Sequence, residues 1–177
     1  MFGPDKANEL LLQCAGDPDC LSDALSTFKF LVEVMKADVN IRDIDGRTAL
    51  GILFNNSLLG RYLLSRGADV FIKDDKGQNA LEICLEYGES WLLEEFQKLG
   101  GEMSILNDSK KMFDYVKILM ITGLASRAVN FIDKGYIFIE PSTASSLMKQ
   151  AQGNFANMVE PIETFELLTR LGAEVEL

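Results

Sequence analysis

The sequence predicts an all-α protein, a solenoid of helix-turn-helix repeats joined by short β-hairpin loops, because the chain repeats itself. The segment 37–50 recurs at 68–81, and Ala, Asp, Val, Ile, Asp, Gly, Ala and Leu stand at matching places. A second block, Leu-Gly followed by Gly or Ala and then Glu, occurs at 99–102 and again at 171–174. Such self-similarity is typical of stacked modules that bury their apolar faces against one another.

Each module is expected to begin with a projecting β-hairpin. Gly46 and Gly77 each follow an aspartate that stands three places earlier, and glycine supplies the positive φ that a tight turn needs. Residues with a high β propensity flank both turns. The sequence therefore predicts short paired strands around Val39, Ile41, Val70 and Ile72.

Two antiparallel helices are expected after each hairpin. Thr48 and Asn79 stand just ahead of an Ala-Leu-x-Ile run, where a short polar side chain is a favourable N-cap. In the second copy the first helix should end at Gly88, and the second helix should cover about 90–99 and end at Gly100. The apolar stripes are expected at Ala80, Leu81, Cys84 and Leu85 in the first helix and at Trp91, Leu92, Phe96 and Leu99 in the second.

These motifs resemble the ankyrin-repeat family. The family's Thr-Pro-Leu-His tetrad is matched in part by Thr-Ala-Leu-Gly at 48–51 and Asn-Ala-Leu-Glu at 79–82, and its Leu-Leu-x-x-Gly-Ala-Asp-Val motif stands at 63–70. Pro and His are missing from both tetrads. In the family the His is understood to link neighbouring turns, so Gly51 and Glu82 in its place should leave repeat packing to apolar contacts.

The resemblance covers the whole chain as a single domain, 1–177, of about five repeats. The approximate repeats are 1–36, 37–67, 68–100, 101–135 and 136–177. The first and last diverge most and are expected to be caps, because the ends of a solenoid face water. The last repeat holds Pro141, Gly153 and Pro161 and is longer than the middle ones, which predicts an inserted loop or an extended outer helix.

Composition argues against several classes of function. The 177 residues carry a net charge of −10, which disfavours nucleic acid and membrane surfaces as partners. The chain has no histidine and no glycine-rich phosphate loop, so a general base, a common metal ligand and a nucleotide site are all missing. We therefore expect no enzyme activity, no metal and no cofactor.

Cysteine use and the lack of a targeting segment predict a cytoplasmic protein. The three cysteines are an odd number, and the spacing of Cys14 and Cys20 suits neither a redox pair nor a zinc site. Both are interpreted as small buried hydrophobic residues near a turn. The N-terminus has no secretory signal, and the longest apolar run, around Ile118, is too short to cross a bilayer.

The candidate binding residues lie at the hairpin tips and along the first helices, because the resemblance implies that these line a concave groove. Charged tip residues are more simply read as a solvated surface, whereas Ile44, between two aspartates, has no evident role in the core. Phe54 and Tyr87 are either interface anchors or packed against a neighbouring repeat. The full set is Arg42, Ile44, Asp45, Arg47, Phe54, Lys73, Asp75, Lys76, Gln78, Glu86 and Tyr87.

The segment Tyr136 to Ile139 departs most from the family pattern, since four large apolar residues follow Gly135. We favour burial of this segment by the last repeat. The alternative is an exposed apolar edge for a partner or a second copy of the chain.

Together these observations predict a monomeric, non-catalytic module that binds a protein partner through its hairpin tips and concave face. The alternative is an acidic inhibitor, an immunity- or effector-like protein that blocks a basic protein surface, because the negative charge is spread along the whole chain. A further possibility is a structural or regulatory domain of a longer protein, although Met1 and the divergent ends favour a complete small protein.

Overall fold

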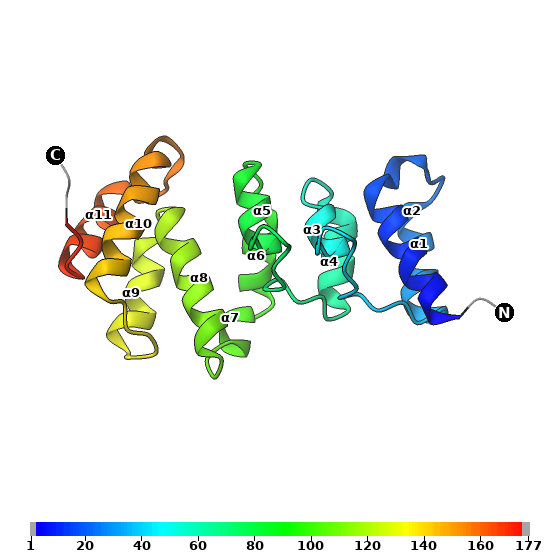
Figure 1. Cartoon of the computed structure of the whole chain (residues 1–177), viewed down its shortest axis with the longest axis horizontal. Helices are drawn as coiled ribbons and strands as arrows, with labels where there is room; N and C mark the ends of the chain where they lie inside the picture. The colour runs from blue at the N-terminus through cyan, green and yellow to red at the C-terminus, as the bar shows by residue number, and fades with distance from the viewer. Residues whose placement is uncertain (1–2, 175–177) are drawn as a thin grey trace. The chain divides into compact units, whose positions relative to one another are not determined.

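The computed structural model describes residues 3–174, and its architecture is all-α. No strand is formed within this range, where a single bridge between Arg42 and Thr48 is the one β-type pairing. The chain divides into two compact units at Gly101 and Glu102. Helices are drawn and labelled in Figure 1, and the short helix α7 (Gly101–Ser104) crosses the division.

The first unit consists of three helix pairs. The first helices of the pairs pack side by side, α1 against α3 and α3 against α5, and the second helices do the same, α2 against α4 and α4 against α6. This is the stacking that tandem repeats use to bury their apolar faces. The elements are α1 (Pro4–Gly16), η1 (Pro18–Cys20), α2 (Ala24–Lys29), the π-helical turn η2 (Phe30–Val34), α3 (Ala49–Ile52), α4 (Ser57–Ser65), α5 (Ala80–Glu86) and α6 (Trp91–Lys98).

The second unit has two helix pairs arranged in the same way. Helix α8 (Ser109–Ile121) pairs with α9 (Ala125–Asp133), and α10 (Pro141–Gly153) pairs with α11 (Pro161–Arg170). Across the pairs, α8 packs on α10 and α9 on α11. The extra length of the last repeat is a loop that includes η3 (Phe155–Asn157) and is tied to the preceding pair.

Main-chain bonds hold this loop in place. The amides of Val159 and Glu160 donate to the carbonyls of Thr122 (3.2 Å) and Gly123 (2.7 Å). Gly123 has a φ of 74° and no room for a side chain, because a Cβ would lie 2.7 Å from that of Met158. Of the two forms expected for the last repeat, the structure therefore shows the inserted loop.

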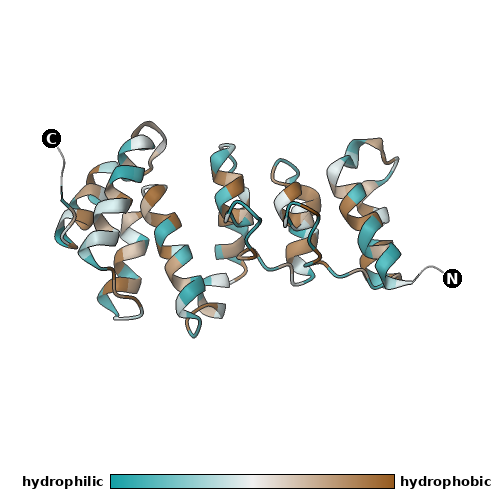
Figure 2. Ribbon diagram, viewed as in Figure 1, coloured by the Kyte–Doolittle hydropathy of each residue, from teal (hydrophilic) through white to brown (hydrophobic). Residues whose placement is uncertain are grey.

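The apolar core follows the repeat. Leu50 and Leu81, which occupy equivalent positions in the two copies, are both fully buried on the first helices α3 and α5. Brown apolar stretches on successive helices mark this pattern in Figure 2. Two positions of the expected stripes are wrong: Leu85 is half-buried while Ile83 is buried, and Leu99 is exposed while Leu93 is buried.

The predicted helix starts and turns are confirmed. Thr48 Oγ1 accepts a hydrogen bond from the Gly51 amide (3.3 Å), and Asn79 Oδ1 accepts one from the Glu82 amide (3.0 Å). The Glu82 carboxylate accepts from the Asn79 amide in return, which completes a capping box. The turn glycines Gly46 and Gly77 have φ values of 76° and 82°, so the positive φ argued for them is present.

The structure does not confirm the predicted strands around these turns. Val39, Ile41, Val70 and Ile72 lie in no strand. Each turn is closed by two main-chain hydrogen bonds, from the Asp43 amide to the Arg47 carbonyl and from Gly46 back to Asp43, with the equivalent pair at Asp74, Gln78 and Gly77. A strand needs a partner over several residues, and these flanks are too short to supply one. The repeats therefore project single tight turns.

Candidate partner-binding surface

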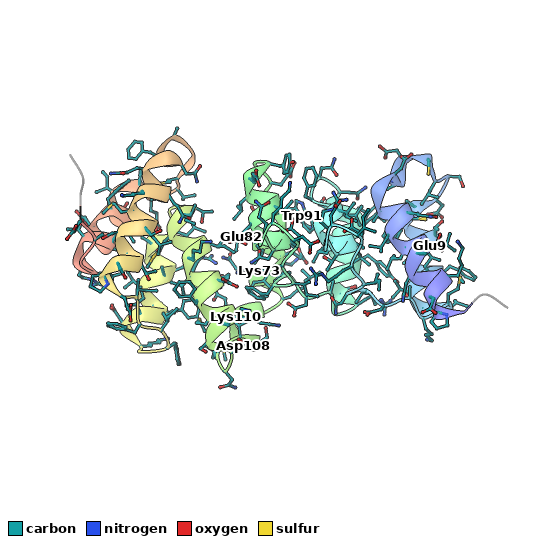
Figure 3. All side chains as sticks on the ribbon, viewed as in Figure 1. Glu9, Lys73, Glu82, Trp91, Asp108 and Lys110 are labelled. Carbon is teal, nitrogen blue, oxygen red and sulfur yellow. The ribbon has the colours of Figure 1, made fainter. Side chains whose placement is uncertain are left out.

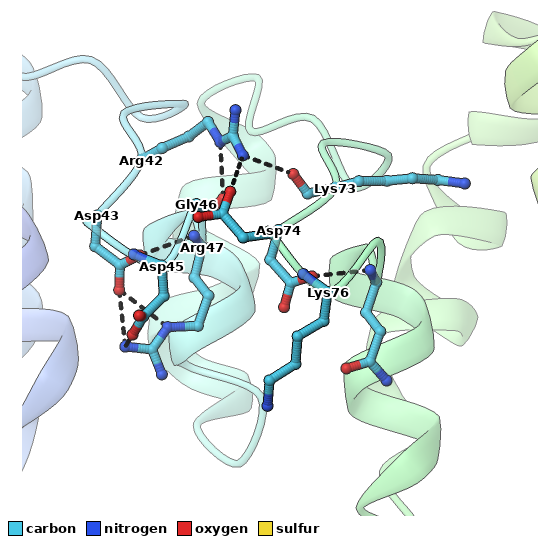
Figure 4. Close-up of polar contacts among 10 residues, drawn as sticks. Arg42, Asp43, Asp45, Gly46, Arg47, Lys73, Asp74 and Lys76 are labelled. Carbon is cyan, nitrogen blue, oxygen red and sulfur yellow. Dashed lines mark hydrogen bonds and ion pairs between the residues drawn. The ribbon is translucent and has the colours of Figure 1, made fainter.

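Two aspartates build the turns that project from the first unit. Asp43 Oδ1 accepts hydrogen bonds from the amides of Asp45 (2.9 Å) and Arg47 (2.8 Å). Asp74, its counterpart in the next copy, accepts from the amides of Lys76 and Gln78 at 2.9 Å each. These bonds fix both turns in one conformation (Figure 4). The sequence places both aspartates three residues before the turn glycines, but their hydrogen bonds to the turn amides were not predicted.

The two turns are also joined to each other. Arg42 Nε donates to the Gly46 carbonyl (2.8 Å), and its Nη2 reaches the Lys73 carbonyl (3.1 Å) and the Asp75 carboxylate (3.2 Å). The Asp75 amide donates to the Asp45 carbonyl (3.0 Å). Arg42 and Asp75, both candidate binding residues, thus have a structural task, and Figure 4 shows the Arg42 side chain reaching across to the next turn.

The tip between these bonds presents an apolar side chain. Ile44 is 97% exposed. Of the aspartates beside it, Asp43 binds the turn amides, and both aspartates pair with the Arg47 guanidinium, at 2.8 Å from Asp43 and 3.1 Å from Asp45. An apolar residue held in water by a rigid turn adds nothing to the core. Lys76 is exposed on the next turn.

The electrostatics of the first turn favour the ionised form of Asp43. Partial burial would raise the pKa of this carboxyl, but the hydrogen bonds from the Arg47 amide and side chain and the Arg47 charge outweigh it, so the pKa of Asp43 is lowered. The same pairing raises the pKa of Arg47. Since the folded-state pKa of Asp43 lies below the unfolded value, its contribution to stability is present above the unfolded pKa and is lost as pH falls through the folded one.

Asp43→Asn should therefore lower the free energy of unfolding by about 1.5 kcal/mol at neutral pH, because charge-assisted hydrogen bonds are replaced by neutral ones. Urea unfolding between neutral pH and about pH 3 measures this. The wild type should lose its advantage over the variant at the acid end. Asp45→Asn is the matched control, because Asp45 is exposed and, among the residues that the structure describes, its carboxylate pairs with the Arg47 side chain alone. An equal loss in both variants would show that Asp43 does not organise the turn.

The aromatic candidates stack on each other across two repeats. The rings of Phe54 and Tyr87 lie 4.2 Å apart between centroids, with an interplanar angle of 24°. The Phe54 carbonyl is held from the next repeat by the indole Nε1 of Trp91 (2.7 Å) and the thiol of Cys84 (3.7 Å). Tyr87 nevertheless stays 63% exposed. The pair thus packs between repeats, which is one of the two expectations, while Tyr87 also faces solvent.

The remaining candidates connect the turns to the first helix of the second copy. The Gln78 side-chain amide donates to the carboxylate of Glu86, which lies at the end of α5. Figure 3 labels Lys73, Glu82 on α5 and Trp91 on α6, which all belong to the second copy. The structure thus groups the predicted residues into three sets: the joined turns, the Gln78–Glu86 bridge and the Phe54–Tyr87 stack.

The apolar segment at 136–139 is only partly covered. Ile139 is buried, as expected, but Phe138 is 80% exposed and Tyr136 is 48% exposed. Alternate residues of an extended segment point to opposite sides, so helix packing can bury one of them while its neighbour faces water. A second exposed apolar group in this unit, which the sequence did not single out, is Phe155, Val159 and Ile162.

All three cysteines lie within residues 3–174. No group of three or more acidic or cysteine side chains is placed to hold a metal ion, and no helix in this range is long and apolar enough to cross a bilayer. Burial of Cys20 was expected, but this residue is exposed, with its Sγ donating to the Asp17 carbonyl at 3.0 Å. Cys14 is half-buried.

Alkylation should separate Cys84 from Cys20. Burial, with a smaller effect of Glu89, raises the pKa of the Cys84 thiol to about 12, so the reactive thiolate is absent at neutral pH. Iodoacetamide should modify Cys20 first and Cys84 only after unfolding, and peptide mass spectrometry follows both sites. Because an unfolded thiol titrates at about pH 8.5, stability should also fall above that pH, and Cys84→Ala should reduce this slope. Equal modification rates of Cys20 and Cys84 in the native state would contradict the burial of the Cys84 thiol.

Comparisons with known proteins leave the family open. No family model and no curated protein matches this chain. A chain of the solved complex between a predatory endopeptidase from Bdellovibrio bacteriovorus and an immunity protein is similar over 90% of this chain and 96% of its own length, with 18% identity and a TM-score of 0.42.

Proposed function

We propose that this chain is an ankyrin-like repeat protein that acts as a non-catalytic protein-binding module. The helix pairs that stack within each unit, the turns that recur at equivalent places in successive copies and the glycines with positive φ support an ankyrin-like architecture. The missing imidazole and the buried, protonated Cys84 support a role in binding instead of catalysis. With a net charge of −10 the chain is expected to repel its own copies and to act as a monomer.

The observation that carries the proposal is the exposure of Ile44 on a rigid support. Free monomers gain nothing from an apolar side chain that is 97% exposed. Because the turn below it is fixed by Asp43 and joined to the next turn through Arg42, docking at this tip would cost little conformational entropy. This is the arrangement expected of an interface anchor.

The second candidate is an acidic inhibitor that blocks a basic protein surface. The negative charge of the chain favours it, because complementary charge raises association rates and makes them sensitive to salt. The two candidates differ in a measurable way. For the inhibitor, the association rate with its partner should fall steeply with salt, whereas an apolar anchor at Ile44 should leave the rate nearly constant.

Comparative affinity capture tests the module. Immobilised wild-type protein and the double variant Ile44→Ser/Lys76→Ala are exposed to an extract of the source cells, and bound proteins are quantified by mass spectrometry. We expect at least one protein to be retained by the wild type and lost from the double variant. Arg42 and Arg47 are left in place because they hold the turns.

Leu58→Ser is the matched control. Leu58 is an exposed apolar residue on α4, the second helix of its pair, and not on a turn. If binding depends only on exposed apolar surface in general, Leu58→Ser should lose bound proteins as well. Retention by Leu58→Ser together with loss from the double variant supports the turn surface. If the wild type, the double variant and Leu58→Ser all retain the same bound proteins equally, the binding site does not lie on the turns.

A further inference from the structure

The Phe54–Tyr87 stack is built as a fixed aromatic platform. One face of the Tyr87 ring packs on Phe54, and yet the residue is 63% exposed, so the opposite face is open to solvent. Phe54 beneath it is anchored through its carbonyl by Trp91 and Cys84. A ring in this setting is oriented before any ligand arrives, which lowers the entropic cost of stacking on it.

The charged residues close to Tyr87 in the sequence are all negative. From Gly77 to Gln97 the sequence carries five glutamates and neither Lys nor Arg, and the segment 48–60 around Phe54 has no charged residue. Three of the glutamates have other tasks: Glu82 caps α5, Glu94 accepts from Ser90 and Glu95 pairs with Arg61.

The other two glutamates flank the exposed ring in sequence. Glu86 accepts a hydrogen bond from the neutral Gln78 amide, which fixes its carboxylate without cancelling its charge. Glu89 is close enough to Cys84 for its charge to raise the pKa of that thiol. The open aromatic face is therefore followed and preceded in the sequence by carboxylates that no cation among residues 3–174 pairs with.

We propose that the Phe54–Tyr87 platform binds an arginine side chain of a basic protein partner, with Glu86 and Glu89 supplying the opposite charge. A guanidinium is planar and weakly hydrated, so it stacks on an aromatic face while its N–H groups donate to neighbouring carboxylates. Lysine offers a compact and more strongly hydrated charge and fits the open ring less well. This inference rests on the proposed protein-binding function and names the chemistry that the partner would present.

A peptide titration tests the platform without the natural partner. The protein is labelled with 3-fluorotyrosine and observed by ¹⁹F NMR. The Tyr87 resonance among its four tyrosines is assigned by its disappearance in Tyr87→Phe. The probe is acetyl-Gly-Gly-Arg-Gly-Gly-amide, compared with the same peptide carrying lysine or the neutral analogue citrulline. We expect a saturable shift of the Tyr87 signal with the arginine peptide, about fivefold weaker binding of the lysine peptide and no shift with citrulline.

Two variants separate the platform from general acidity. Glu86→Gln should weaken binding of the arginine peptide by about fivefold, as expected for the loss of one nearby charge. Glu94→Gln, the same change on an exposed glutamate of α6, should leave it unchanged. Phe54→Leu keeps Tyr87 as the reporter and should also weaken binding, with circular dichroism confirming the fold.

The peptide titration and the affinity capture test the platform and the turn surface separately. Equal binding of all three peptides, or an equal effect of Glu86→Gln and Glu94→Gln, would overturn the arginine platform. If the peptide fails to bind while capture still depends on Ile44 and Lys76, this inference is wrong and the proposed function stands. If the peptide binds but capture does not depend on the turns, the platform stands and the turn-based function is wrong.

Discussion

Gly60→Ala should lower the free energy of unfolding by about 3 kcal/mol, a large effect for the addition of one methyl group. Gly60 lies in α4 where α6 packs against it, and the Trp91 ring occupies the space that a side chain would need. A Cβ at this position would overlap Cη2 of the ring and lie 2.9 Å from Cζ2. The ring cannot move aside freely, because its Nε1 donates to the Phe54 carbonyl at 2.7 Å.

A double-mutant cycle identifies this clash as the cause. Trp91→Phe removes the ring atoms that meet the new methyl group, so Gly60→Ala should cost much less in that background than in the wild type. Gly16→Ala is the matched control, because Gly16 ends α1 and a Cβ there meets nothing within 4 Å. Urea unfolding measures the cycle and the control. Additive effects of Gly60→Ala and Trp91→Phe would show that the loss has another origin.

The features predicted correctly from the sequence are those set by local chemistry. The caps at Thr48 and Asn79 need only a polar side chain ahead of an apolar run, and the turns at Gly46 and Gly77 need only a residue that tolerates positive φ. Because the segments 37–50 and 68–81 match, the cap and the turn could be predicted in both copies. The all-α class followed from them.

The features that the sequence did not predict depend on neighbours distant in the chain. Leu99 and Cys20 look like core residues by type, but the helices around them leave both exposed. In the Phe54–Tyr87 stack the two residues do not occupy equivalent places in their copies, so periodicity gave no reason to pair them. The role of Arg42 was missed for a related reason, since its side chain reaches into the following turn.

Leu81→Ala should lower the free energy of unfolding by about 3–4 kcal/mol, as large core deletions do when the surroundings relax only partly. Leu81 is fully buried on α5, and α5 packs against both α3 and α6. The cavity would therefore weaken the helix pair itself and its contact with the preceding repeat. Leu50→Ala, the equivalent change on α3, should have a similar cost because Leu50 is equally buried.

The control is Leu58→Ala on the exposed side of α4, which should cost less than about 0.5 kcal/mol. Urea unfolding gives the three free energies, and hydrogen exchange shows where protection is lost. If the repeats of the first unit stack as nearest neighbours, Leu81→Ala should reduce the protection of α3 as well as that of α5. Loss confined to α5 would mean that each pair is stable alone, and repeat stacking would then contribute little to the fold.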